Sequence, residues 1–106
     1  MLIFGNIRKG LKEAEATRGS LLVDVREAGE YAMGHIPGAV NAPLSALSEA
    51  ALPKDRPLFL YCLHGSRSLR AVHRLKKQGY EARSIGGIHG YTGPLERQEE
   101  KGDNHG

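Results

Sequence analysis

Cysteine is nearly absent from this sequence, which has one thiol, Cys62, among 106 residues. A single cysteine forms no internal disulfide and supplies no zinc site built from four cysteines. A protein that relays electrons through an internal disulfide needs a second, resolving cysteine, and this sequence has none. Cys62 is therefore either an inert core residue or a reactive thiol that an acceptor outside the chain must discharge.

Tryptophan is absent, and the aromatic residues are four Tyr and two Phe, which leaves few rings to stack on nucleic-acid bases. The net charge of +3 is modest, so the excess of Lys and Arg reads as a solvated face. No apolar run approaches the roughly 18 residues of a membrane span, and Met1–Phe4 is too short for a signal peptide. We expect a cytoplasmic protein with no membrane or nucleic-acid partner.

The chain has the length and composition of one globular domain, with 40% hydrophobic and 25% charged residues. We expect this domain to span residues 1–98 and to end in a frayed polar tail, residues 99–106. Short apolar runs alternate with helical patterns along the domain. This alternation predicts an α/β fold with a small, mostly parallel central sheet and helices on both faces.

The expected elements follow from periodicity and from turn residues. Strands are predicted over Leu21–Val25, Ala39–Asn41, Leu58–Tyr61 and Glu81–Ile85, followed by a turn at Gly86–Gly87. Helices are predicted over Ile7–Thr17, Glu27–Met33, Leu44–Leu52 and Ser66–Gln78, with a short closing helix over Ile88–Arg97. The helix over 66–78 has the clearest pattern, because its apolar positions recur at helical spacing and a glycine follows it.

Cys62 stands where the strongest strand ends and a small, polar and basic segment begins. A loop that opens a helix turns backbone N–H groups and a positive dipole end toward its centre, which stabilises an anion there. Such a setting favours the thiolate, the nucleophilic form of cysteine. We expect Gly65 to permit the tight loop and Ser66 to cap the helix. The alternative is a buried strand-end cysteine beside an ordinary turn, and an isolated cysteine alone favours it.

Three segments resemble the rhodanese family in its own order. "LLVDVREAGEYAMGHIPGAVNAPL" resembles its D-V-R, E-Y and G-H-I-P-G-A-x-N signature, and "LYCLHGSRS" resembles the active-site segment C-x-x-G-x-R-S of single-domain members. "SIGGIHGY" resembles its G-G-x-x-x-W element, with Tyr91 where Trp is usual. The resemblance covers about three quarters of the chain. It implies a three-layer rhodanese-like fold and a sulfurtransferase of the thiosulfate sulfurtransferase (rhodanese) type.

What the resemblance implies for chemistry is a persulfide on Cys62, loaded from thiosulfate or a protein persulfide and discharged to cyanide or a thiol. The anion-binding loop would comprise Leu63, His64, Gly65, Ser66 and Arg67. Its C-x4-R length is that of sulfur-transferring members, whereas related phosphatases and arsenate reductases use C-x5-R, so those activities are disfavoured alternatives. A non-catalytic interaction or sulfur-carrier module is the other alternative. The same resemblance implies no cofactor.

Supporting roles are expected for residues outside the loop. Arg67 would neutralise the sulfonate of thiosulfate, with a solvated arginine as the alternative. In relatives the matching positions brace the pocket through hydrogen bonds, which assigns a structural role to Asp24, Arg26, Glu30 and His35. The five histidines show no metal-ligand spacing, so we expect no metal and place them on surfaces and loops. Tyr91 would bring its hydroxyl to the pocket rim, and the protein would be a monomer or weak dimer.

Overall fold

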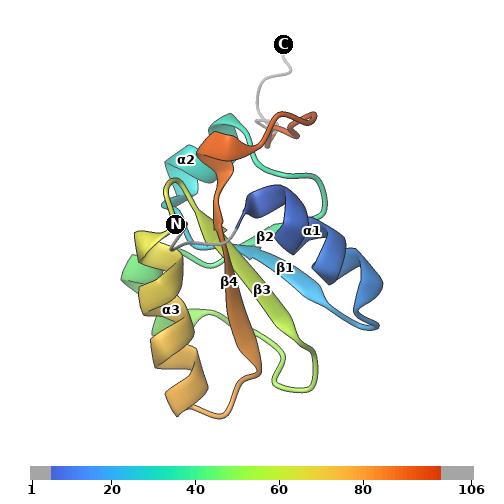
Figure 1. The fold of residues 1–106 in the computed structure, drawn as a ribbon. Coiled ribbons are helices and arrows are strands. Elements are labelled where there is room, and N and C mark those ends of the chain that lie inside the picture. Colours follow the sequence, from blue (N-terminus) through green and yellow to red (C-terminus); the bar gives the residue numbers. More distant parts are fainter. Residues whose placement is uncertain (1–5, 99–106) are drawn as a thin grey trace.

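A four-stranded parallel sheet forms the centre of the computed structural model, which describes residues 6–98 (Figure 1). The strands are β1 (Leu21–Asp24), β2 (Val40–Asn41), β3 (Leu58–Cys62) and β4 (Ala82–Gly87). They lie in the order β2-β1-β3-β4, and every neighbouring pair is parallel. The predicted α/β class with a parallel central sheet is confirmed.

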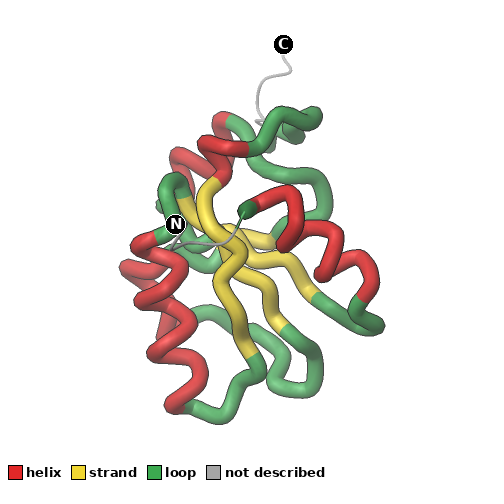
Figure 2. The backbone as a smooth tube through the Cα atoms, in the orientation of Figure 1, coloured by secondary structure: helices red, strands yellow, loops and turns green. Residues whose placement is uncertain are grey.

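Helices cover both faces of the sheet (Figure 2). They are α1 (Ile7–Ala16), α2 (Ala28–Met33) and α3 (Ser66–Lys77), together with the 3-10 helices η1 (Leu44–Glu49) and η2 (Ile88–Gly90). Helix α3 and η1 pack on one face, and α1 packs on the other. The result is the three-layer arrangement that the sequence pattern predicts.

Strand β3 is buried on both faces, which is why it reads as a continuous apolar run. Successive side chains of a strand point to opposite faces. Leu58, Leu60 and Cys62 accordingly join the core cluster beneath α3 and η1. Phe59 and Tyr61 join the second cluster, beneath α1. This alternation places the Cys62 side chain on the α3 side, at the carboxyl end of a central strand.

Three expected boundaries are wrong. Gly86–Gly87 is the end of β4 rather than a turn. The helix expected over 44–52 is the shorter 3-10 helix η1, interrupted by non-helical backbone at Ala46. The expected closing helix shrinks to η2, because Glu96 instead pairs with His35 through two backbone hydrogen bonds of 2.8 Å. The expected tail, 99–106, lies outside the described residues.

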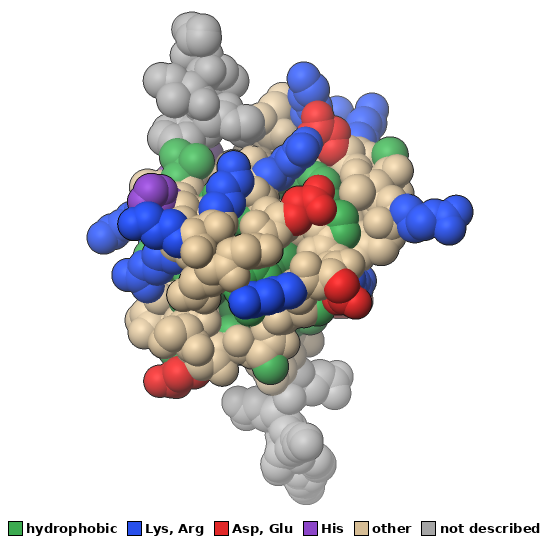
Figure 3. All heavy atoms as spheres, turned by 90° about the horizontal axis from the view of Figure 1, so that it is seen from below, with side chains coloured by type: hydrophobic (Ala, Val, Ile, Leu, Met, Phe, Trp, Pro, Cys, Tyr) green, Lys and Arg blue, Asp and Glu red, His purple; other side chains and the backbone are tan. Residues whose placement is uncertain are grey.

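The end of the molecule that faces away from the carboxyl ends of the strands carries mixed charge. Figure 3 shows Lys and Arg side chains scattered over this face, with acidic side chains between them. Two of the cations lie over aromatic rings: Arg83 is 5.5 Å from the ring centre of Phe59, and Lys54 is 5.2 Å from that of Tyr80. This interspersed pattern is typical of a solvated face.

A membrane crossing requires a long apolar helix. Between residues 6 and 98, none of the helices combines the length and the apolar character that such a crossing needs.

Candidate active site

A tight loop connects β3 to α3 and begins at Cys62. Gly65 adopts a φ of +115°, in a region that residues with side chains rarely occupy. Gly65 is also the N-cap of α3, and no side chain caps this helix. The predicted capping role of Ser66 is therefore wrong, since Ser66 is the first helical residue. The amides at this helix start are directed at the cysteine instead.

The sulfur of Cys62 contacts two backbone amides and one hydroxyl group. Cys62 is 1% exposed. Its Sγ accepts hydrogen bonds from the backbone amides of Gly65, at 3.0 Å, and Ser68, at 3.3 Å. The Ser68 hydroxyl oxygen lies 3.7 Å from the same sulfur. Two amides at a helix N-terminus stabilise negative charge on the atom that they contact. The sulfur thus lies against two backbone amides at the start of a helix, the arrangement expected of an anion-binding loop.

A pair of serine hydroxyls adjoins the sulfur, and sequence reasoning missed both residues. Ser68 is fully buried, and its hydroxyl donates to the carbonyl of Gly65 at 3.0 Å. Its oxygen lies 2.7 Å from the hydroxyl oxygen of Ser84 on β4. The available signal was the last serine of "LHGSRS", Ser68, which directly follows the predicted loop and is the third residue of α3.

Strand β4 supports the loop through Gly87, the third residue that sequence reasoning missed as part of the site. A Cβ atom on Gly87 would lie 2.3 Å from the Leu63 carbonyl oxygen and 2.7 Å from the His64 Cα. Only glycine lets the two backbones approach this closely. The Leu63 carbonyl also accepts the His89 amide at 3.1 Å. The end of β4 and the start of η2 thus hold the loop in place.

Arg67 pairs with Glu30 of α2 rather than standing free in the loop. Its two terminal nitrogens lie 2.7 and 3.1 Å from the Glu30 carboxylate oxygens, a bidentate pair. The hydrogen bond from Arg67 lowers the pKa of Glu30 from 4.5 to about 2, and the same bond raises the pKa of Arg67. Arg67 is therefore a partly exposed member of an ion pair, and its partner is a residue that was expected only to brace the pocket.

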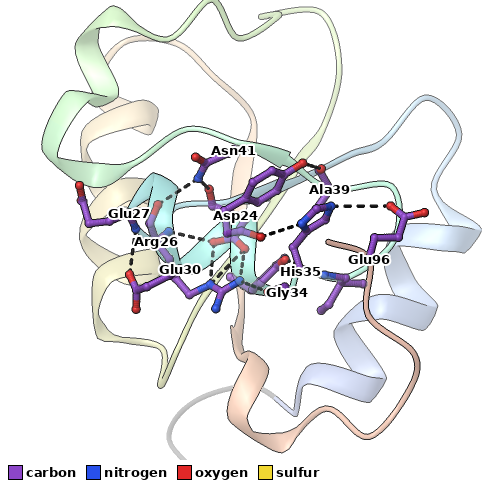
Figure 4. A network of polar contacts seen from close by, with 12 residues as sticks. Asp24, Arg26, Glu27, Glu30, Gly34, His35, Ala39, Asn41 and Glu96 are labelled. Carbon is purple, nitrogen blue, oxygen red and sulfur yellow. Dashed lines mark hydrogen bonds and ion pairs between the residues drawn. The ribbon is translucent and has the colours of Figure 1, made fainter. Parts of the chain in front are cut away.

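Asp24 and Arg26 form a buried ion pair behind α2 (Figure 4). The Arg26 Nη2 lies 2.7 Å from both an Asp24 carboxylate oxygen and the Gly34 carbonyl oxygen. Asn41 of β2 donates from its side chain to the backbone carbonyls of Asp24 and Arg26, at 2.9 and 3.0 Å. The contacts tie β1, β2 and α2 together. A bracing role for both residues stays a prediction, and these contacts are the ones through which they would exert it.

The histidines occupy two environments. His35 lies in the loop between α2 and β2, which fits the expected loop position, but it is buried rather than at the surface and stacks on Tyr31, with ring centres 3.7 Å apart. His64 is exposed in the loop and lies 4.6 Å, between ring centres, from His89. Across residues 6–98, no group of three or more His, Cys, Asp or Glu side chains is arranged to hold a metal ion.

Tyr91 occupies a different place from the expected one. Its hydroxyl donates to the Pro94 carbonyl at 2.9 Å. Its ring lines a cavity of about 500 Å³ that also borders Leu11 of α1 and Ile36. None of the residues from Cys62 to Arg67 lines this cavity. The hydroxyl is thus committed to the segment after η2 rather than to the rim of the Cys62 loop.

A family model described as a rhodanese-like domain matches residues 8–93, the region that contains the sheet, the loop and its supports. The chain belongs to this family. Among proteins of known sequence, it is 44% identical over 78 residues to the uncharacterized protein YqhL of Bacillus subtilis. That match covers 69% of this chain and 62% of YqhL.

Two further relatives agree with membership of the rhodanese-like family. A sulfurtransferase of Allochromatium vinosum is 42% identical over 66 residues, which cover 60% of this chain and 62% of that protein. A crystal structure of a rhodanese-like domain protein from Staphylococcus aureus superimposes with a TM-score of 0.77 at 26% identity, covering 92% of this chain and all of that one. This chain spans somewhat less than two thirds of the length of YqhL and of the Allochromatium vinosum sulfurtransferase.

Proposed function

We propose that this protein is a sulfurtransferase that carries a sulfane sulfur as a persulfide on Cys62, with thiosulfate or a protein persulfide as donor. One observation carries the proposal: the buried Cys62 sulfur accepts two backbone amides, from Gly65 and Ser68, at the start of α3. Membership of the rhodanese-like family and the sulfurtransferase relative from Allochromatium vinosum support it.

The loading step breaks one sulfur–sulfur bond and forms another. The Cys62 thiolate attacks the outer sulfur of thiosulfate, and sulfite leaves with the electron pair of the broken bond. For a persulfide donor the leaving group is the donor's own thiolate. The terminal sulfur left on Cys62 carries the negative charge, and we propose that amides of the loop stabilise it, which is supported by the contacts of the Gly65 and Ser68 amides with Sγ.

Discharge requires an acceptor from outside the chain. Cyanide or a thiolate attacks the terminal sulfur of the persulfide, and the Cys62 thiolate leaves. Since the sequence contains one cysteine, no internal disulfide can take the place of this acceptor. We therefore propose a role within a transfer chain, in a cytoplasmic setting, with a small thiol or a protein as the acceptor.

The loop gives less support to a phosphatase or arsenate reductase. Such chemistry needs a cation free to neutralise a tetrahedral oxyanion. Arg67, the cation that the loop contributes, is held by both oxygens of the Glu30 carboxylate. A sulfur carrier without useful turnover and an enzyme would both form the persulfide on Cys62. These two roles differ only in the rate at which the persulfide is discharged.

Intact mass spectrometry tests the proposal. Incubation with thiosulfate should add one sulfur atom to the wild-type mass, and cyanide should remove it with release of thiocyanate. Cys62→Ser should abolish both events. Thiocyanate production by Cys62→Ser at the wild-type rate would overturn the mechanism. A persulfide that forms but is not released to cyanide or thiols within minutes would favour the carrier over the enzyme.

A further inference from the structure

The carboxylate of Glu30 stands at the edge of the proposed sulfur site and is built into position. Its Oε1 accepts the backbone amide of Glu27 at 2.9 Å, one half of the capping box that begins α2. The same oxygen accepts Arg67 at 2.7 Å. Glu30 is thus held from two sides, by its own helix and by the loop.

This pair changes what an incoming donor meets. An unpaired Arg67 would offer a positive charge to the sulfonate of thiosulfate. The paired guanidinium offers much less, because the Glu30 carboxylate offsets its charge and accepts a hydrogen bond from each terminal nitrogen. The pKa of Glu30, lowered to about 2 by the hydrogen bond from Arg67, keeps this carboxylate ionised at every physiological pH.

Arg26, the other arginine whose charge acts on Glu30, is paired as well. The guanidinium of Arg26 is held by Asp24. Glu27 adds another carboxylate at the same end of α2, and its charge also acts on Arg67. A donor with two negative charges therefore has to approach carboxylates, or to displace Glu30 from Arg67.

We propose that Glu30 sets the donor specificity of this site: by neutralising Arg67 it selects sulfur donors of low negative charge, such as thiol persulfides, over the dianion thiosulfate. This inference rests on the proposed sulfurtransferase function. It makes Glu30 a specificity-determining residue that acts through Arg67 rather than by touching the sulfur. Loading then follows the balanced step given above, with the donor thiolate as leaving group.

A matched pair of small donors isolates the effect of charge. Thiosulfate carries two negative charges, whereas methanethiosulfonate carries one and donates the same kind of sulfur. At an effective dielectric constant between those of protein and water, removing the Glu30 charge should lower KM roughly threefold per donor charge. For Glu30→Gln, KM should thus fall roughly tenfold for thiosulfate and roughly threefold for methanethiosulfonate. With cysteine persulfide the fall should be no larger than for methanethiosulfonate, and kcat should change little for all three.

Two variants on the same helix serve as controls. Glu27→Gln removes an equal charge nearby without breaking the Arg67 pair, so KM for thiosulfate should change by less than about twofold. Glu30→Asp keeps the charge while shortening the side chain, and its KM for thiosulfate should stay close to that of the wild type. Circular dichroism and thermal melting establish that each variant is folded.

The outcomes separate this proposal from the one on which it rests. Wild-type protein that gains no sulfur from any donor overturns the sulfurtransferase function, and donor selection with it. Sulfur loading with equal Glu30→Gln effects on all donors overturns the role of Glu30 alone. Should Glu30→Gln fail to fold, the wild type still decides: kcat/KM for methanethiosulfonate should exceed that for thiosulfate at least about tenfold, and equal values overturn the proposal.

Discussion

The hydroxyl oxygens of Ser68 and Ser84 lie 2.7 Å apart beside the Cys62 sulfur, where α3 meets β4. The Ser68 proton is donated to the Gly65 carbonyl, which also accepts the Leu69 amide at 3.1 Å. If Cys62 reacts as a thiolate, as proposed, the Ser68 hydroxyl could donate to the sulfur instead, because the amide of Leu69 would still satisfy that carbonyl.

Removing the Ser68 hydroxyl should slow sulfur loading. A hydrogen bond to a charged group contributes about 1.5–3 kcal/mol, so Ser68→Ala should lower the rate of persulfide formation by roughly tenfold or more. Ser84→Ala should have a smaller effect, and the double variant should resemble Ser68→Ala. Single-turnover mass spectrometry measures these rates. Ser45→Ala, an exposed hydroxyl that bonds Glu27, is the control. Equal rates in all variants would contradict a role for the pair.

A methyl group on Gly87 should displace the loop. Gly87→Ala places its Cβ against the Leu63 carbonyl and the His64 backbone, where an ideal Cβ would be 2.3 and 2.7 Å away. We expect a loss of about 1–3 kcal/mol in the free energy of unfolding, as for other overpacked sites, together with slower sulfur loading. Urea denaturation and the mass assay measure the two effects.

The matched control for this change is Gly29→Ala in α2. Nothing lies within 4 Å of a Cβ at Gly29, and alanine favours a helix over glycine by about 1 kcal/mol. Gly29→Ala should therefore stabilise the protein slightly and leave loading unchanged. Unchanged stability and loading in Gly87→Ala would show that the loop moves without cost.

Low pH should lower the free energy of unfolding, in part because Glu30 becomes protonated. Its pKa falls from 4.5 to about 2 on folding because Arg67 donates to it, so the pair stabilises the folded state above pH 4.5. This contribution is lost as the pH drops from about 4.5 to about 2. Because the Arg67 and Glu30 side chains are 29% and 35% exposed, solvent screening limits it to about 1 kcal/mol.

The comparison of wild type with Glu30→Gln measures this contribution. Urea denaturation at pH 6 should show the wild type more stable by about 1 kcal/mol, and the difference should vanish near pH 2. Groups that titrate equally in both proteins cancel from the difference. A gap that stays constant over this range would mean that the Glu30 charge is not what stabilises the pair.

Local pattern was enough to predict the elements that hold the cysteine. The apolar run of β3 and the helical spacing of α3 fix where the strand ends and where the helix begins, so the position of Cys62 between them follows from the sequence. Hydrophobic periodicity reports burial directly, which is why both elements were placed correctly.

Local sequence pattern could not predict the contacts between segments that lie far apart in the sequence. Glu30 and Arg67 are 37 positions apart, and Ser68 meets Ser84 only because α3 packs beside β4. The need for glycine at position 87 appears only when the end of β4 reaches the Leu63 carbonyl. The prediction of a closing helix over residues 88–97 was wrong for another reason. Gly93 and Pro94 interrupt the helical pattern, and the backbone of Glu96 pairs with His35 instead.

The Asp24–Arg26 pair should act on stability rather than on sulfur chemistry. Asp24 is fully buried, and the Arg26 side chain is 8% exposed. Asp24→Asn leaves the guanidinium buried without a counter-charge, which should cost about 3 kcal/mol in the free energy of unfolding. Glu13→Gln removes the partner of Arg83 from an exposed pair, at 3.4 Å, and should cost less than about 1 kcal/mol.

The rate of sulfur loading shows whether the Asp24–Arg26 pair contributes to the sulfur chemistry as well as to stability. The loading rate is compared per folded molecule, at a temperature well below the melting temperature of the variant. Asp24→Asn should then load sulfur from methanethiosulfonate at close to the wild-type rate, because the Asp24–Arg26 pair braces α2 and β2 rather than the Cys62 sulfur. Urea denaturation and single-turnover mass spectrometry on the same preparation give both quantities. If Asp24→Asn were as stable as the wild type but loaded sulfur slowly, Asp24 would contribute to the sulfur chemistry. Its negative charge would then act electrostatically on Cys62, at the end of the neighbouring strand β3.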